Sequence, residues 1–183
     1  MRARIWLAGL GVLLSAGCGA EQDRQVAVPE VEPVTVEVAA ASSGGACKLL
    51  DFAAIAKHTG GRFDVAAASD QGDTHTCVVR AEGATWPELM LTVTDTSIDV
   101  PTFNTDLRPD GAVTVSKLGQ VAYRRTSAKT AKHGPVAEVG WLATEDRLAT
   151  LRWTSRPNAA RAEADAQATK LIALARTLNT RAM

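Results

Sequence analysis

The sequence predicts a single α+β domain, in which an antiparallel β-sheet carries a long C-terminal helix and a short N-terminal helix, with one disulfide. Three observations predict this class. Short segments rich in β-branched residues alternate with turn residues through the middle of the chain. The last long helical segment has a single apolar stripe, which needs one sheet face to cover it. Two cysteines in the same region can form one bond.

The first 17 residues have the pattern of an export signal. Arg2 and Arg4 give a basic start, and residues 5–14 are an apolar run interrupted only by two glycines. This run is about ten residues long, whereas a membrane-spanning helix needs about 20. We therefore predict that residues 1–17 are a signal peptide.

Cys18 follows a run of small residues, Ser15-Ala16-Gly17, that resembles the lipobox of bacterial lipoproteins. The resemblance implies that the thiol of Cys18 is acylated with diacylglycerol and that this residue becomes the new N-terminus. The protein would then be anchored in the cell membrane and face its extracytoplasmic side. An ordinary secretory signal followed by an incidental cysteine is the alternative.

Residues 18–46 have the composition of a tether. Residues 19–46 hold five acidic side chains against one basic side chain and no aromatic residue, so they have little apolar surface to bury. Residues 34–38 alternate as a short edge strand would, which leaves a strand as the alternative. The predicted globular domain comprises residues 47–183.

Cys47 and Cys77 form an even pair once Cys18 is assigned to the lipid. Because an exported protein enters an oxidising compartment, we predict a disulfide between them. A zinc site with His75 and His58 is the alternative, but structural zinc sites usually present their ligands in two close pairs, and only one is found here. The sequence therefore predicts no metal.

The first half of the domain is predicted to form a helix and three strands. Asp51 is a suitable N-cap, and Gly60-Gly61 ends the helix. Residues 63–68 and 75–81 are expected to form a hairpin around a five-residue loop. Residues 88–95 alternate between apolar and polar side chains, as a half-buried strand does.

The second half is predicted to form further strands and the long helix. The strand candidates are residues 112–115, 120–125, 136–144 and 147–154, the last two joined by a tight turn at Glu145-Asp146. Asn158 is the expected N-cap of the final helix because it follows Pro157. The stripe recurs at three- and four-residue spacing and consists of Ala164, Ala168, Leu171, Ile172, Ala175 and Leu178.

These features together resemble the domain-of-unknown-function 3558 family of actinobacterial cell-envelope lipoproteins. The resemblance covers Cys47 to about Leu178 and rests on short motifs, among them Ala-Cys47-Lys-Leu-Leu-Asp51 and Leu118-Gly-Gln-Val-Ala-Tyr123. It implies an exported, lipid-anchored α+β domain with an internal disulfide, and no known activity.

Composition and motifs exclude several classes of function. The chain has 20 basic and 20 acidic side chains, whereas non-specific binding of nucleic acid needs a basic excess. The sequence contains no nucleophile elbow, P-loop or His-Glu-x-x-His motif. His58, His75 and His133 have no partner motif. We therefore expect no enzymatic activity, no catalytic residue and no cofactor.

One segment of the chain has an unusual distribution of charge. No acidic residue lies between Asp110 and Glu138, and five basic side chains do: Lys117, Arg124, Arg125, Lys129 and Lys132. We call these five residues the basic block. They are candidate contacts to an anionic surface, with residues 126–134 as a protruding loop. The alternative is a solubilising loop.

Three functions stay open on the sequence alone. The first is a non-enzymatic envelope lipoprotein that binds an unknown envelope protein or ligand. The second is a sensor-like domain for a small apolar ligand, which a pocket between helix and sheet lined by Trp and Leu would favour. The third is an unrecognised hydrolase. Trp141 and Trp153 are either core residues or walls of such a pocket.

Overall fold

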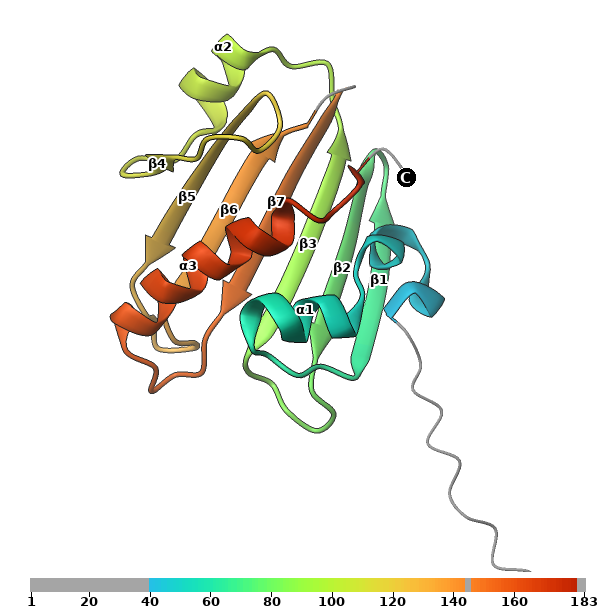
Figure 1. The fold of residues 1–183 in the computed structure, drawn as a ribbon, viewed down its shortest axis with the longest axis vertical. Coiled ribbons are helices and arrows are strands. Elements are labelled where there is room, and N and C mark those ends of the chain that lie inside the picture. The colour runs from blue at the N-terminus through green and yellow to red at the C-terminus, as the bar shows by residue number, and fades with distance from the viewer. Residues whose placement is uncertain (1–39, 144–145, 181–183) are drawn as a thin grey trace, which may run out of the picture. The chain divides into compact units, whose positions relative to one another are not determined.

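The computed structural model describes residues 40–143 and 146–180, all within one compact unit of the chain. The expected signal peptide, Cys18 and most of the expected tether lie outside the described residues. In the described part, seven antiparallel strands form one sheet in the order β1-β2-β3-β7-β6-β5-β4. Helices α1 and α3 lie across one face of it (Figure 1). The predicted α+β class is confirmed.

Two 3-10 helices, η1 (Ala40–Ser43) and η2 (Gly45–Leu49), begin before the predicted start of the domain at Cys47 and pack against the sheet. Ala40 is 1% exposed, and the Ser43 Oγ donates a hydrogen bond to the Ala66 carbonyl at 2.9 Å. The expected boundary at Cys47 thus falls inside the packed region. The cause is that small alanine and serine side chains fit closely against β1, although their composition is that of a linker.

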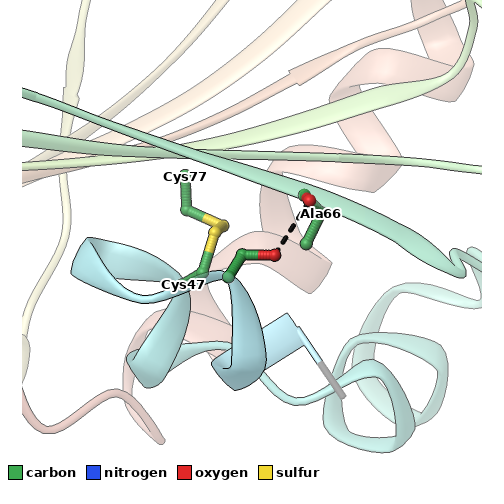
Figure 2. The surroundings of a disulfide bond; sticks show 4 residues. Cys47, Ala66 and Cys77 are labelled. Carbon is green, nitrogen blue, oxygen red and sulfur yellow. Dashed lines mark hydrogen bonds between the residues drawn. A yellow bond between two sulfur atoms is a disulfide. The ribbon is translucent and has the colours of Figure 1, made fainter. Parts of the chain in front are cut away.

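A disulfide joins Cys47 of η2 to Cys77 of β2 (Thr74–Arg80). The two Cα atoms are 4.9 Å apart, and both side chains are fully buried. Figure 2 shows the bond beside the hydrogen bond that Ala66 accepts. The predicted disulfide is confirmed, and it fixes the N-terminal helices to the second strand.

Helix α1 (Phe52–Thr59) has the predicted termini. The Asp51 carboxylate accepts hydrogen bonds from the backbone N–H groups of Ala53 and Ala54, both at 3.2 Å. Gly60 ends the helix with φ 77°. Ile55 is fully buried and directs this helix onto the sheet.

Strands β1 (Val65–Gln71) and β2 form the predicted hairpin, but its loop is shorter than predicted. Gln71 pairs with Thr74, so Gly72-Asp73 alone makes the turn. The polar residues 69–71 belong to the strand because β1 is an exposed edge, where backbone pairing needs no apolar side chain. Strand β3 (Glu88–Asp95) has the predicted bounds.

The remaining strands are β4 (Val113–Thr114), β5 (Val121–Ser127), β6 (Val136–Leu142) and β7 (Arg147–Thr154). Strands β6 and β7 pair antiparallel, as predicted. The turn expected at Glu145-Asp146 lies partly outside the described residues. Strand β7 lies between β3 and β6 at the centre of the sheet, and its residues Ala149 and Leu151 are fully buried.

Residues 96–112 cover part of the second sheet face, which the sequence did not predict. Helix α2 (Val100–Thr102) continues into the π-helical turn η3 (Phe103–Leu107). The Phe103 side chain is fully buried against Tyr123 and Leu142. The domain therefore has a small second core opposite the main one.

Helix α3 (Arg161–Ala175) begins later than predicted. Its N-cap is Ala160, not Asn158, because the Glu163 carboxylate accepts the Ala160 backbone N–H at 3.1 Å and so satisfies the first turn. The apolar stripe is buried as predicted at Ala164, Ala168 and Leu171. Gln167 is also buried, 7% exposed, on the same face.

Candidate functional site

A pocket of about 510 Å³ lies where the C-terminal end of α3 passes the end of β6 and the turn before β5. We call it the α3–β6 pocket. Its apolar lining consists of Leu118, Trp141, Ala143, Ala175 and Leu178. Most of this lining belongs to the main core, and Trp141 is only 2% exposed. The pocket is thus an extension of the core that is open to solvent.

Two cationic side chains, Lys117 and Arg176, also line the α3–β6 pocket, and no acidic side chain among residues 40–143 and 146–180 lines it. One Arg176 guanidinium nitrogen donates to the Ser116 carbonyl at 2.9 Å, which ties the end of the helix to the turn that carries Lys117. A guanidinium has five N–H donors, and this is its one hydrogen bond within the described residues. The lining therefore combines apolar surface with positive charge.

The turn that presents Lys117 depends on left-handed backbone. Lys117 has φ 60° and Gly119 has φ 57°. A Cβ atom on residue 119 would lie 2.2 Å from the Leu142 carbonyl oxygen, so only glycine fits there. The left-handed conformation of Lys117 costs about 1 kcal/mol relative to an ordinary one. The turn therefore holds the Lys117 backbone in a conformation that only glycine adopts freely.

The structure does not gather the basic block on one surface. Lys117 lies before β5 and Lys129 and Lys132 lie after it, so seven strand residues, about 20 Å at ~3.3 Å per residue, separate them. Arg124 and Arg125 are neighbours on β5, so their side chains leave opposite faces of the sheet. The protruding loop carries only Lys129 and Lys132 of the five.

Arg125 has an acidic partner. Its guanidinium lies 3.7 Å from a Glu138 carboxylate oxygen on the neighbouring strand β6. The same oxygen accepts a hydrogen bond from the Tyr123 hydroxyl at 3.0 Å. Arg125 therefore neutralises Glu138 within the sheet and is less available to an anionic surface than the sequence suggested.

Burial raises the pKa of Tyr123 well above its ordinary value, and the nearby Glu138 carboxylate raises it further. The folded state therefore favours the neutral phenol. The contribution of this preference to the free energy of unfolding is complete below ~pH 10 and is lost as the pH rises beyond it. We expect little phenolate absorbance from the native protein at about pH 11, and full absorbance once denaturant is added. Tyr123 is the one tyrosine in the sequence, so the ultraviolet titration reports on it alone. Ionisation at the ordinary pKa without unfolding would contradict this.

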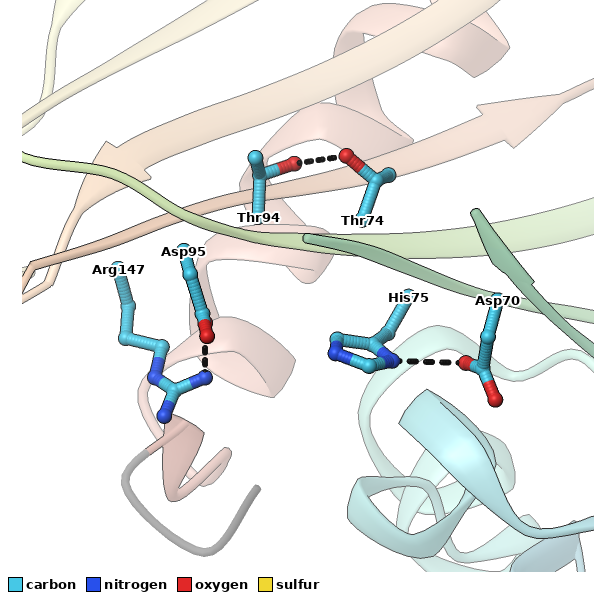
Figure 3. Close-up of polar contacts among 6 residues, drawn as sticks. All are labelled: Asp70, Thr74, His75, Thr94, Asp95 and Arg147. Atoms are coloured by element: carbon cyan, nitrogen blue, oxygen red, sulfur yellow. Dashed lines mark hydrogen bonds and ion pairs between the residues drawn. The ribbon is translucent and has the colours of Figure 1, made fainter. Parts of the chain in front are cut away.

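His75 and the acidic residues near it form separate polar pairs. The His75 Nδ1 lies 2.7 Å from an Asp70 carboxylate oxygen, and Arg147 pairs with Asp95. Figure 3 shows these two pairs on one side of the strands, with Thr74 and Thr94, 3.0 Å apart, on the other. In the described residues, no hydrogen bond or ion pair links His75 to His58. The arrangement offers no support for the hydrolase hypothesis.

The three tryptophans of the described part have different surroundings. Trp141 lines the α3–β6 pocket and Trp153 lines a second, smaller cavity near the start of α3. Trp86 makes an edge contact with His133, with ring centroids 6.0 Å apart. Trp141 and Trp153 thus satisfy both expectations at once, as core residues that also form pocket walls.

Sequence reasoning missed Arg176 and Gln167. Arg176 follows the last residue of α3, far along the chain from Lys117, and only the return of the helix over the sheet brings the two together. Gln167 interrupts the buried face of α3 with a polar side chain. Gln167 lies three residues after Ala164 and four before Leu171, which is the spacing of the buried face of a helix. This position was the signal in the sequence from which its burial could have been predicted.

Comparison with protein-family models, with curated proteins and with solved structures finds no match to this chain. Within residues 40–143 and 146–180, no three His, Cys, Asp or Glu side chains are grouped in a way that could hold a metal ion. No helix in that part of the chain has the length and hydropathy needed to span a bilayer.

Proposed function

We propose that this protein is an exported, lipid-anchored domain without enzymatic activity that binds a small amphiphilic anion in the α3–β6 pocket. The observation that carries the proposal is the lining of that pocket, which joins apolar core side chains to Lys117 and Arg176. A chain or ring would lie against Trp141 and Leu178, and a carboxylate or phosphate would meet the two cations. This is the sensor-like alternative of the sequence analysis, refined by the charge of the lining.

The size of the pocket supports this function. Pockets for small molecules have volumes of about 300–1,000 Å³. The α3–β6 pocket, at about 510 Å³, falls within that range. Arg176 also binds the Ser116 carbonyl, so one cation is already held in position before a ligand arrives.

The location of the protein is part of the proposal. Lipid on Cys18 would hold the domain at the extracytoplasmic side of the cell membrane, with residues 19–39 as a spacer. Fatty acids and phosphorylated lipids share this environment and have the apolar and anionic parts that the pocket matches. Membership of the domain-of-unknown-function 3558 family is compatible with this role and stays a prediction.

Lys117→Gly tests the pocket. Because glycine adopts the left-handed backbone without strain, the variant removes the cation and does not lower the melting temperature. We expect its affinity for decanoate to fall about fivefold, which corresponds to ~1 kcal/mol for a solvent-accessible ion pair. Affinity for the neutral alcohol decanol should not change. Isothermal calorimetry on the chain from residue 19 onward measures both.

The matched control is Lys129→Gly, which removes one charge of the same sign from the loop after β5. It should bind decanoate like the wild type. Equal losses in Lys117→Gly and Lys129→Gly would mean that decanoate responds to overall charge and not to the α3–β6 pocket, and the proposal would fail.

A further inference from the structure

A second cavity, of about 200 Å³, lies near the start of α3, between this helix, the end of β7 and Pro87. We call it the Trp153 cavity. Its polar lining residues are Ser155, Arg156, Glu163 and Gln167. Gln167 and Ala175, a lining residue of the α3–β6 pocket, are eight positions apart on α3, or about 12 Å along the helix axis. The two cavities are therefore separate sites.

The Gln167 side chain is the unusual feature of this cavity. The residue is 7% exposed, and its amide nitrogen Nε2 is buried with no hydrogen-bond partner. Buried amide groups are nearly always hydrogen-bonded, because losing water without gaining a partner is costly. Gln167 lines the Trp153 cavity, so a rotation of its side chain about the last dihedral angles would bring the Nε2 to a hydrogen-bond acceptor placed there.

The Trp153 wall of the cavity is rigid. The Phe63 and Trp153 rings pack edge to face, with centroids 5.4 Å apart and an interplanar angle of 67°. A Cβ atom on residue 61 would lie 2.5 Å from the indole, so Gly61 allows the backbone to close against it. Trp153 is only 8% exposed. The indole is thus held in place as an apolar wall of the cavity that Gln167 also lines.

The charges around the cavity balance. Arg156 and Glu163 both line it, one cationic and one anionic. One Glu163 oxygen accepts the Ala160 backbone N–H, which leaves the other oxygen as an acceptor. A neutral ligand that both accepts and donates hydrogen bonds fits these charged and polar side chains better than an ion of either sign.

The geometry points to a binding site for a small ring compound that bears a neutral amide. The ring lies against Trp153 and Pro87. The amide oxygen accepts a hydrogen bond from the Gln167 Nε2, and the amide N–H donates to Glu163. This ligand class differs from the amphiphilic anion of the α3–β6 pocket, and the inference does not depend on that proposed function.

Benzamide is the probe for this site, and the full chain in detergent solution is the protein. In a ¹H–¹⁵N spectrum, the side-chain NH₂ signals of Gln167 should shift on addition of benzamide. We expect a saturating shift for benzamide and at least a tenfold weaker effect for benzoate, which has no N–H to donate to Glu163. If the Gln167 signals do not move while the probe is raised to its solubility limit, the inference is wrong.

Gln167→Leu supplies the second measurement. Leucine has a similar volume and suits the apolar stripe of α3, so the variant should keep or raise the melting temperature, because the unpaired donor is gone. Benzamide binding, followed by the backbone signals of Trp153 and Ser155, should weaken at least tenfold. Binding as tight as in the wild type would show that the amide of Gln167 does not recognise the probe.

The matched control is Lys170→Leu, on the same helix. Lys170 donates to the Thr59 carbonyl at 3.2 Å and does not line the Trp153 cavity. Its replacement should leave benzamide affinity unchanged. A loss equal to that of Gln167→Leu would assign the effect to general changes in α3 and would overturn the inference.

Discussion

Replacing both Cys47 and Cys77 with alanine should lower the free energy of unfolding by about 3.7 kcal/mol. The disulfide closes a loop with a sequence separation of 30, and the chain-entropy treatment gives this value for a loop of that length. The bond also fixes η2 to the sheet, where Ala46 and Cys47 are both fully buried. Its loss should therefore free the N-terminal helices before the central strands.

Chemical denaturation of the two proteins measures the difference. For a domain of this size, a loss of that magnitude corresponds to a melting temperature about 10 °C lower. Reducing agent should lower the wild-type stability to that of the double variant and leave the double variant unchanged. A double variant within 1 kcal/mol of the wild type would show that packing alone holds η2 on the sheet.

Cys18→Ser should move the protein from the membrane fraction to the soluble fraction. Serine cannot form the thioether that carries the diacylglycerol, so a cleaved Cys18→Ser chain has no lipid anchor. The effect should be nearly complete, because a cleaved chain would lose its apolar signal as well. Cell fractionation and labelling with a radioactive fatty acid test this directly.

Gly19→Ala is the matched control for Cys18→Ser, because it changes the neighbouring residue and keeps the thiol. This variant should remain in the membrane fraction and take up label. If Cys18→Ser protein is cleaved normally and stays in the membrane, the lipoprotein prediction fails.

Features that depend on local pattern were predicted well from the sequence. Asp51 and Gly60 bound α1 because capping is decided by residues next to the helix end. The bounds of β3 follow from alternation within the strand itself. The start of α3 was misplaced because two local signals compete: Asn158 is a good cap by type, but Glu163 reaches back to Ala160.

Features that depend on contacts between distant residues were not predicted. Residues 40–46 have a linker's composition, and only their fit against β1 shows that they belong to the domain. The second core could not be predicted from Phe103, because its partners Tyr123 and Leu142 lie on strands farther along the chain. The basic block was a cluster in sequence only, since β5 separates its ends and alternation divides Arg124 from Arg125.

The candidate site also depends on contacts between residues that are distant in the sequence. Lys117 was selected from the sequence for its charge, but it was grouped with four basic residues that do not line the pocket. Its neighbour in the pocket is Arg176, which joins it through the turn at Ser116. Trp141 was selected as either core or pocket, and a strand position at the edge of a core allows it to be both.

The most direct test of the proposed function is to map where decanoate binds. A ¹H–¹⁵N titration of the chain from residue 19 onward reports on every backbone amide at once. The proposal predicts saturating shifts that are largest at Lys117, Gly119, Trp141 and Arg176, with α1 and β1 unaffected. Shifts centred elsewhere, or small shifts that spread over all exposed apolar residues without saturation, would contradict an amphiphile site in the α3–β6 pocket.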